Sequence, residues 1–117
     1  MITGVHHFSI ISSSETSVSF YKTLGFKEIS RIERSYDTVI LFKGPEIQLE
    51  MYLDPKHPSH PSSPEPLGIR CISLKTDNIK NTLKELGLEN TEISTDWNGQ
   101  KYCFINDPDN VPIQLHE

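Results

Sequence analysis

Four side chains of this sequence have types and a spacing that could bind a metal ion: His7, Glu50, Cys71 and Gln114. The first and third are 64 residues apart, as are the second and fourth, and their flanking residues align at the same offset. Each lies in an alternation of apolar and polar residues that predicts a β-strand. A duplicated unit with such side chains at equivalent strand positions can bring all four to one shared cavity. The repeat therefore predicts a metal site.

The chemistry of these four donors favours a divalent cation. Imidazole and carboxylate are good ligands for zinc and for harder ions, and a thiolate prefers zinc or iron. Gln114 can offer only a neutral amide oxygen. Three strong ligands with a weak or open fourth position are typical of catalytic zinc. Zinc is the best match, with nickel, manganese, iron or no metal as alternatives.

Ordinary structural interpretations of the same residues stay open. A single histidine on a strand is more often a hydrogen-bonding residue than a ligand, and a single cysteine is usually a small core side chain. Glu50 and Gln114 could simply be solvated on an open face. As a further alternative, Cys71 could be a reactive thiol beside an empty site.

The first half of the chain reads as strand, helix and three strands. Residues 3–11 alternate as a strand. Ser12 and Glu15 match a capping box that would begin a helix, and Gly25 is suited to end it. The next strands are predicted at 26–34, 36–43 and 46–53.

The second half repeats this order. Residues 69–75 predict a strand, Thr76-Asp77 a helix start and Gly87 the helix end. Asn98-Gly99 is a hairpin signal. The last strands are predicted at 91–95, 101–106 and 111–116.

These elements predict an α+β fold of two tandem βαβββ modules whose curved mixed sheets surround one cavity. We expect a single domain, 1–117, built from modules 1–53 and 68–117. Between them, 54–67 is a proline-rich connector, which proline makes stiff and extended.

The period of two along a strand assigns side chains to faces. His7 and Ser9 share a polar face and His6 takes the other; Glu50 and Tyr52 share a face in the same way. The candidates for lining the cavity are Tyr52, Trp97, Tyr102 and His116. We expect Cys103 to be structural, and too far from Cys71 for a disulfide if the last strand lies between their strands.

Composition restricts the class of protein. The chain has 117 residues, 35% hydrophobic and 23% charged, with a net charge of -5. Scattered basic residues argue against nucleic-acid binding. No apolar run approaches a membrane span and the N-terminus lacks a secretion signal, so we expect a cytoplasmic location without a membrane partner. Two cysteines are too few for a disulfide scaffold.

Several motifs resemble the vicinal-oxygen-chelate superfamily, which contains glyoxalases, dioxygenases and bleomycin-resistance proteins. Its opening strand and helix are similar to Gly4–Ile10 and Ser19–Phe26. The start of its second module is similar to Gly68–Leu74 followed by Asp77–Ile79, and its closing motif to Asn106–Leu115. The proline-rich connector is most similar to small stand-alone glyoxalase-like proteins of the YaeR type.

The resemblance implies His7 and Glu50 as metal ligands, Cys71 where the family usually has His, and Gln114 where it usually has Glu. An amide is not a general base, so Glu50 would be the remaining catalytic carboxylate. The implied function is that of a metal-dependent lyase or isomerase acting on a small carbonyl or thiol-adduct substrate. The alternative is a metal-free small-molecule binding or sequestering protein of bleomycin-resistance type. A homodimer is expected in either case.

Overall fold

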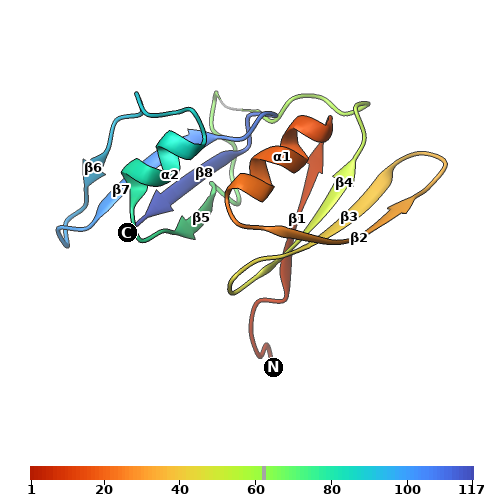
Figure 1. Cartoon of the computed structure of the whole chain (residues 1–117), viewed down its shortest axis with the longest axis horizontal. Helices are drawn as coiled ribbons and strands as arrows, with labels where there is room; N and C mark the ends of the chain where they lie inside the picture. Colours follow the sequence, from red (N-terminus) through yellow and green to blue (C-terminus); the bar gives the residue numbers. More distant parts are fainter. Residues whose placement is uncertain (62) are drawn as a thin grey trace. The chain divides into compact units, whose positions relative to one another are not determined.

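The chain folds as two units with the same order of elements. A computed structural model describes residues 1–61 and 63–117, and the units are Met1–Pro58 and Ser59–Glu117. The first contains β1 (His7–Ser12), α1 (Glu15–Thr23), β2 (Lys27–Glu33), β3 (Thr38–Lys43) and β4 (Gln48–Leu53). The second contains β5 (Ile72–Lys75), α2 (Ile79–Glu85), β6 (Ser94–Thr95), β7 (Lys101–Asn106) and β8 (Pro112–His116). Figure 1 shows these elements along the chain.

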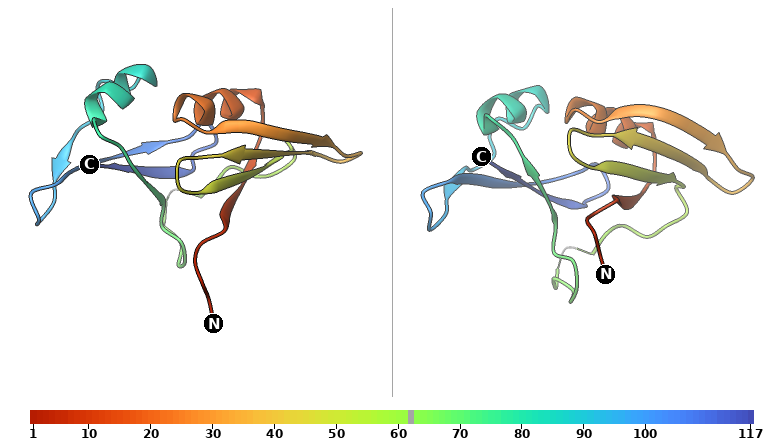
Figure 2. Two further views of the ribbon diagram at one scale, coloured as in Figure 1. Left: turned by 60° about the horizontal axis from the view of Figure 1, so that its bottom comes forward. Right: turned by 90° about the horizontal axis from the view of Figure 1, so that it is seen from below.

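Each unit contains one open, mixed, four-stranded sheet. The strand orders are β1-β4-β3-β2 and β5-β8-β7-β6. The parallel pairs are β1 with β4 and β5 with β8, which are the first and last strands of each unit along the chain. The other pairs are antiparallel. Figure 2 shows α1 on one face of its own sheet, and α2 likewise. The predicted α+β fold of two βαβββ modules is confirmed.

The core of the first unit lies between α1 and its sheet. Alternate residues of the central strands point at the helix and are buried, while their neighbours are more exposed, as a sheet covered on one side requires. Each large apolar side chain buried in this way contributes about 1.5–3 kcal/mol. The core residues are Ile10, Val18, Tyr21, Phe26, Ile40, Phe42, Leu49 and Met51.

The second unit repeats this arrangement, with Ile79 and Leu83 of α2 buried beside its sheet. Cys103 belongs to this core at 2% exposure, and burial raises the pKa of its thiol. β8 lies between the strand that follows Cys71 and the strand that carries Cys103. Both cysteines are free thiols, as expected. No helix within residues 1–61 and 63–117 is long and apolar enough to cross a membrane.

The predicted capping box was wrong. The N-cap of α1 is Ser14, whose hydroxyl accepts a hydrogen bond from the N–H of Thr16. Ser12 instead ends β1, and its buried hydroxyl has no hydrogen-bond partner in the part of the chain that the structure describes. In the second unit Asn78 caps α2 in place of Thr76-Asp77, through a bond from the N–H of Asn81.

Both opening strands also begin later than predicted, at His7 rather than residue 3 and at Ile72 rather than residue 69. The parallel ladder between β5 and β8 starts at Ile72 opposite Ile113. One step earlier the partner strand offers Pro112, which has no N–H to donate. The segment before Ile72 is therefore left outside the sheet.

Gly25 and Gly87 end the two helices, as predicted. Their φ angles of 105° and 71° lie in the region that favours glycine. The added Cβ of an alanine at Gly25 would meet no atom within 4 Å. Any cost of that substitution therefore comes from the backbone conformation alone.

We predict that Gly25→Ala lowers the free energy of unfolding by about 1–2 kcal/mol. Urea denaturation of the purified protein measures it. Gly4→Ala is the matched control, because Gly4 also has open space but no positive φ. Equal stability of the two variants would contradict the conformational argument.

Candidate functional site

The predicted ligands of the first unit lie on the face of its sheet that α1 does not cover. His7 and Ser9 are exposed, whereas Ile10 is buried against the helix. The parallel register pairs Ser9 with Glu50 and His7 with Gln48. His7 lies two residues before Ser9 on β1, and Ser9 is paired with Glu50. His7 and Glu50 are therefore diagonal neighbours on the same face.

The Glu50 carboxylate is oriented through one of its two oxygens. The Tyr52 hydroxyl donates to Oε1 at 2.5 Å, and the Ser9 hydroxyl makes a longer contact to the same oxygen at 3.5 Å. No side chain of the described residues hydrogen-bonds to Oε2. A carboxylate fixed on one side and free on the other is suited to bind a metal ion or accept a proton.

The His7 ring, like the Glu50 carboxylate, has one polar atom in contact with a neighbour. Its Nδ1 lies 2.7 Å from Nδ1 of His6, so one ring donates and the other accepts. The rings meet edge to face with centroids 5.0 Å apart. His6 lies just before β1, so the alternation of the strand does not assign its side chain to a face, and its predicted orientation stays a prediction. Among the described residues, none contacts Nε2 of His7 through a hydrogen bond.

Tyr52 is itself held in place. Arg34 forms a bidentate ion pair with Asp37, with both nitrogen–oxygen distances at 2.6 Å. Its guanidinium lies 4.6 Å from the ring centroid of Tyr36 and 5.7 Å from that of Tyr52. The hydrogen bond to Glu50 raises the pKa of Tyr52, and burial of the phenol raises it further. The phenol therefore stays protonated and keeps donating to the carboxylate.

The second unit reproduces the central contact with one chemical difference. Ser73 is paired with Gln114 in the parallel register, and its hydroxyl donates to Oε1 of Gln114 at 2.8 Å. Ser73 and Gln114 are the repeat equivalents of Ser9 and Glu50. The same scaffold position thus carries a carboxylate in one unit and a neutral amide in the other.

The remaining predicted residues lie apart from this contact. Cys71 is half-buried and immediately precedes β5. The rings of Tyr102 and His116 stack with an interplanar angle of 14°. Trp97 is 92% exposed in the turn between β6 and β7, where Asn98-Gly99 forms the predicted hairpin.

Each unit by itself contains two of the four predicted ligands. Within the described residues, no three His, Cys, Asp or Glu side chains gather as a metal-binding group. The donor types nevertheless fit zinc, because an imidazole nitrogen and a carboxylate oxygen are free and already oriented by neighbours. The complete set of His7, Glu50, Cys71 and Gln114 draws on both units and stays a prediction.

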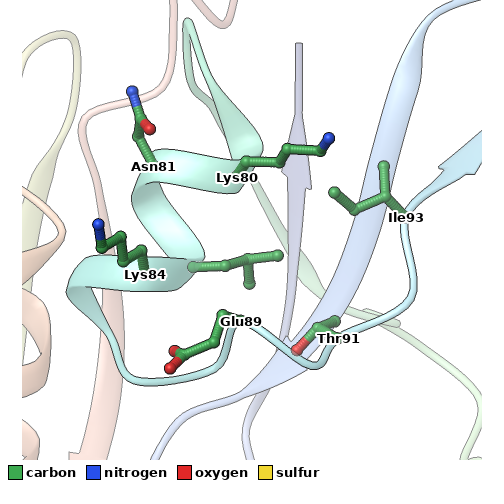
Figure 3. A pocket seen from close by; sticks show the side chains of 7 residues that line it. Lys80, Asn81, Lys84, Glu89, Thr91 and Ile93 are labelled. Atoms are coloured by element: carbon green, nitrogen blue, oxygen red, sulfur yellow. The ribbon is translucent and has the colours of Figure 1, made fainter.

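A separate hollow of about 480 Å³ lies beside α2 (Figure 3). Leu83 and Ile93 give it an apolar wall, and Lys80 and Lys84 stand at its rim. In Figure 3 the amino groups of the two lysines point in different directions. They do not converge on one anion, and none of the predicted site residues lines this hollow.

Comparison with known proteins identifies the family. The model of the glyoxalase/bleomycin resistance protein/dioxygenase superfamily matches residues 4–115. The chain belongs to this superfamily. Its two βαβββ units with open mixed sheets are those of the glyoxalase-like fold, as predicted.

Two relatives are small proteins of the same kind. YwkD of Bacillus subtilis is 31% identical over 127 residues, covering 100% of this chain and 98% of YwkD. YaeR of Escherichia coli is 30% identical over 123 residues, covering 97% and 95%. Both are described as uncharacterized. The solved structure of SMU.1112c has a TM-score of 0.86 at 28% identity and covers 100% of both chains.

More distant structures share the fold alone. The fosfomycin resistance protein FosX of Listeria monocytogenes, solved with Mn(II), has a TM-score of 0.76 at 14% identity, covering 99% of this chain and 93% of FosX. Lactoylglutathione lyase of Agrobacterium tumefaciens has a TM-score of 0.67 at 13% identity, covering 99% and 94%. One of these two proteins with the same fold is named a lyase, and the other was solved with Mn(II).

Two supporting residues were missed by the sequence analysis. The contact of His6 with His7 was not predicted, and Tyr52 was predicted only as a lining residue. The alternation did indicate that Tyr52 shares a face with Glu50, which is the signal that could have identified the contact.

We predict that Glu50→Gln lowers the pKa of Tyr52 towards its ordinary value, because the charged acceptor that favours the protonated phenol is lost. Tyrosinate absorbance followed against pH measures this, with Tyr52→Phe identifying the transition. Glu46→Gln, at an exposed position of the same unit, is the control. An unchanged Tyr52 transition in Glu50→Gln would contradict the hydrogen bond.

Proposed function

We propose that this chain is a glyoxalase-like lyase or isomerase that uses a divalent metal, with zinc as the best match to the donors, on a small carbonyl or thiol-adduct substrate. One observation carries the proposal: His7 and Glu50 each have one polar atom engaged by a neighbour and another free. Ligands of catalytic metals are commonly oriented in this way by an outer layer of hydrogen bonds. Cys71 and Gln114 would complete the set.

In this proposal the residues have distinct roles. A bound divalent cation would supply Lewis-acid polarisation of a substrate oxygen. Oε2 of Glu50 would accept a proton from the substrate carbon beside that oxygen, while Tyr52 and Ser9 hold Oε1. Gln114 cannot accept a proton and would orient the substrate or act as a weak ligand. Proton transfer would therefore rest on one carboxylate.

The second candidate is a metal-free protein that binds or sequesters a small molecule, as bleomycin-resistance proteins do. Cys71 stands where the resemblance implies His, which favours it. So does the amide at Gln114, which binds cations weakly compared with a carboxylate. A homodimer and a cytoplasmic location remain expectations under both candidates.

We predict that protein purified without a metal-affinity tag contains stoichiometric zinc, measured by elemental analysis. His7→Ala and Glu50→Gln should lose it and the activity, because each removes a strong ligand. Tyr52→Phe should weaken zinc affinity by about tenfold, as loss of an outer hydrogen bond to a ligand typically does.

His60→Ala is the matched control, since it removes a histidine from the exposed connector. Its zinc content should equal that of the unmodified chain. Absence of metal at every purification step, or equal zinc in Glu50→Gln and the unmodified protein, would overturn the enzyme proposal and support the binding protein.

A further inference from the structure

The open face of the second unit carries a row of aromatic rings along β7 and β8. The rings of Tyr102 and His116 stack with centroids 6.4 Å apart, and Phe104 meets Tyr102 edge to face at 5.9 Å. Phe104 is 45% exposed although its neighbours Cys103 and Ile105 are buried. Such a surface can pack against the flat face of a conjugated molecule.

A cation stands at one end of this row. The guanidinium of Arg70 lies 5.6 Å from the ring centroid of Phe104. Arg70 also pairs with Glu65 at 2.6 Å, but both side chains are largely exposed, at 70% and 53%. Exposed ion pairs contribute little to stability. A carboxylate supplied by a ligand can therefore replace Glu65 on the guanidinium at small cost.

Gln114 makes the centre of the face compatible with an anion. It lies opposite Phe104 on one side and Ser73 on the other. Its Oε1 accepts from Ser73, so its amide nitrogen is left to donate to a ligand oxygen. A carboxylate at this position would repel an anion in a partly desolvated setting. Next to His116, the carboxylate of Asp96 accepts hydrogen bonds from the N–H groups of Asn98 and Gln100, and its other oxygen lies 3.3 Å from Nε2 of His116.

We propose that this face binds a planar, conjugated carboxylate, which packs against Phe104 and Tyr102, its flat face on one ring and its edge on the other because the two rings are nearly perpendicular, while its carboxylate pairs with Arg70. The inference rests on the proposed small-molecule function and names the chemical class of its ligand. The flat π system packs against the aromatic rings. The negatively charged carboxylate pairs with Arg70 and accepts a hydrogen bond from the Gln114 amide. Recognition of an anionic ligand would explain why Gln114 stands where the resemblance implies Glu.

The test is titration of the full chain, kept free of metal with a chelator, with 2-naphthoate. Backbone amide resonances of residues 102–104 and 114–116 should shift and saturate with a Kd of about 1 mM, the affinity typical of a ligand of this size. Cyclohexanecarboxylate lacks the π face and 2-naphthamide lacks the charge, so both should bind at least about fivefold more weakly. Equal binding of either analogue, or no saturable shift at these residues, overturns the proposal.

Variants separate the contributions. Arg70→Gln and Phe104→Leu should each weaken 2-naphthoate by at least about fivefold. Lys101→Gln is the matched control, because Lys101 is an exposed cation of β7 that alternates with Phe104 and takes the other face. It should bind 2-naphthoate normally, and an equal loss in Lys101→Gln and Arg70→Gln would show only general charge attraction and overturn the proposal.

Gln114→Glu distinguishes this inference from the metal proposal. It should weaken 2-naphthoate in metal-free protein and raise zinc affinity, because a carboxylate repels the anion and attracts the cation. Unchanged 2-naphthoate affinity overturns the inference whatever the zinc result. Conversely, 2-naphthoate binding with the expected variant pattern supports it even if no zinc is ever found.

Discussion

Parallel pairing between the first and last strand of each unit determines where the candidate functional side chains lie. It sets Ser9 opposite Glu50 and Ser73 opposite Gln114. A slip of one residue would turn every side chain of a strand to the other face. That slip is prevented because Leu49 and Met51 are fully buried on the face that α1 covers. The apolar core therefore fixes the register, and the register fixes the polar face.

This constraint explains why the sequence predicted so much of the fold. Equivalent strands of the two units have the same alternation, so the repeat at 64 residues correctly predicted the order of elements and the shared face of Glu50 and Tyr52. The boundaries were harder, because they depend on partners. Three consecutive serines offer the same hydroxyl, and Ser14 is the cap because it directly precedes the first helical residue and its hydroxyl accepts from the N–H of Thr16. The start of β5 depends on Pro112, far away in the chain.

The supporting contacts of the site could not be predicted from alternation. Which atom Tyr52 reaches is decided by side-chain geometry, and its hydroxyl meets Oε1 of Glu50. His6 lies just outside the strand, where the period of two no longer assigns a face. These contacts change the interpretation of the repeat, because the first unit presents an imidazole and a carboxylate that neighbours hold in place. The second presents an amide with aromatic rings and a guanidinium.

X-ray absorption spectroscopy of the zinc-loaded full-length protein tests the central claim most directly. We expect one sulfur ligand at about 2.3 Å, from Cys71, and nitrogen or oxygen ligands near 2.0–2.2 Å with the scattering pattern of imidazole, from His7. In Cys71→Ser the sulfur contribution should disappear while the imidazole pattern remains. A zinc shell of water oxygens alone, unchanged by Cys71→Ser and His7→Ala, would contradict the account.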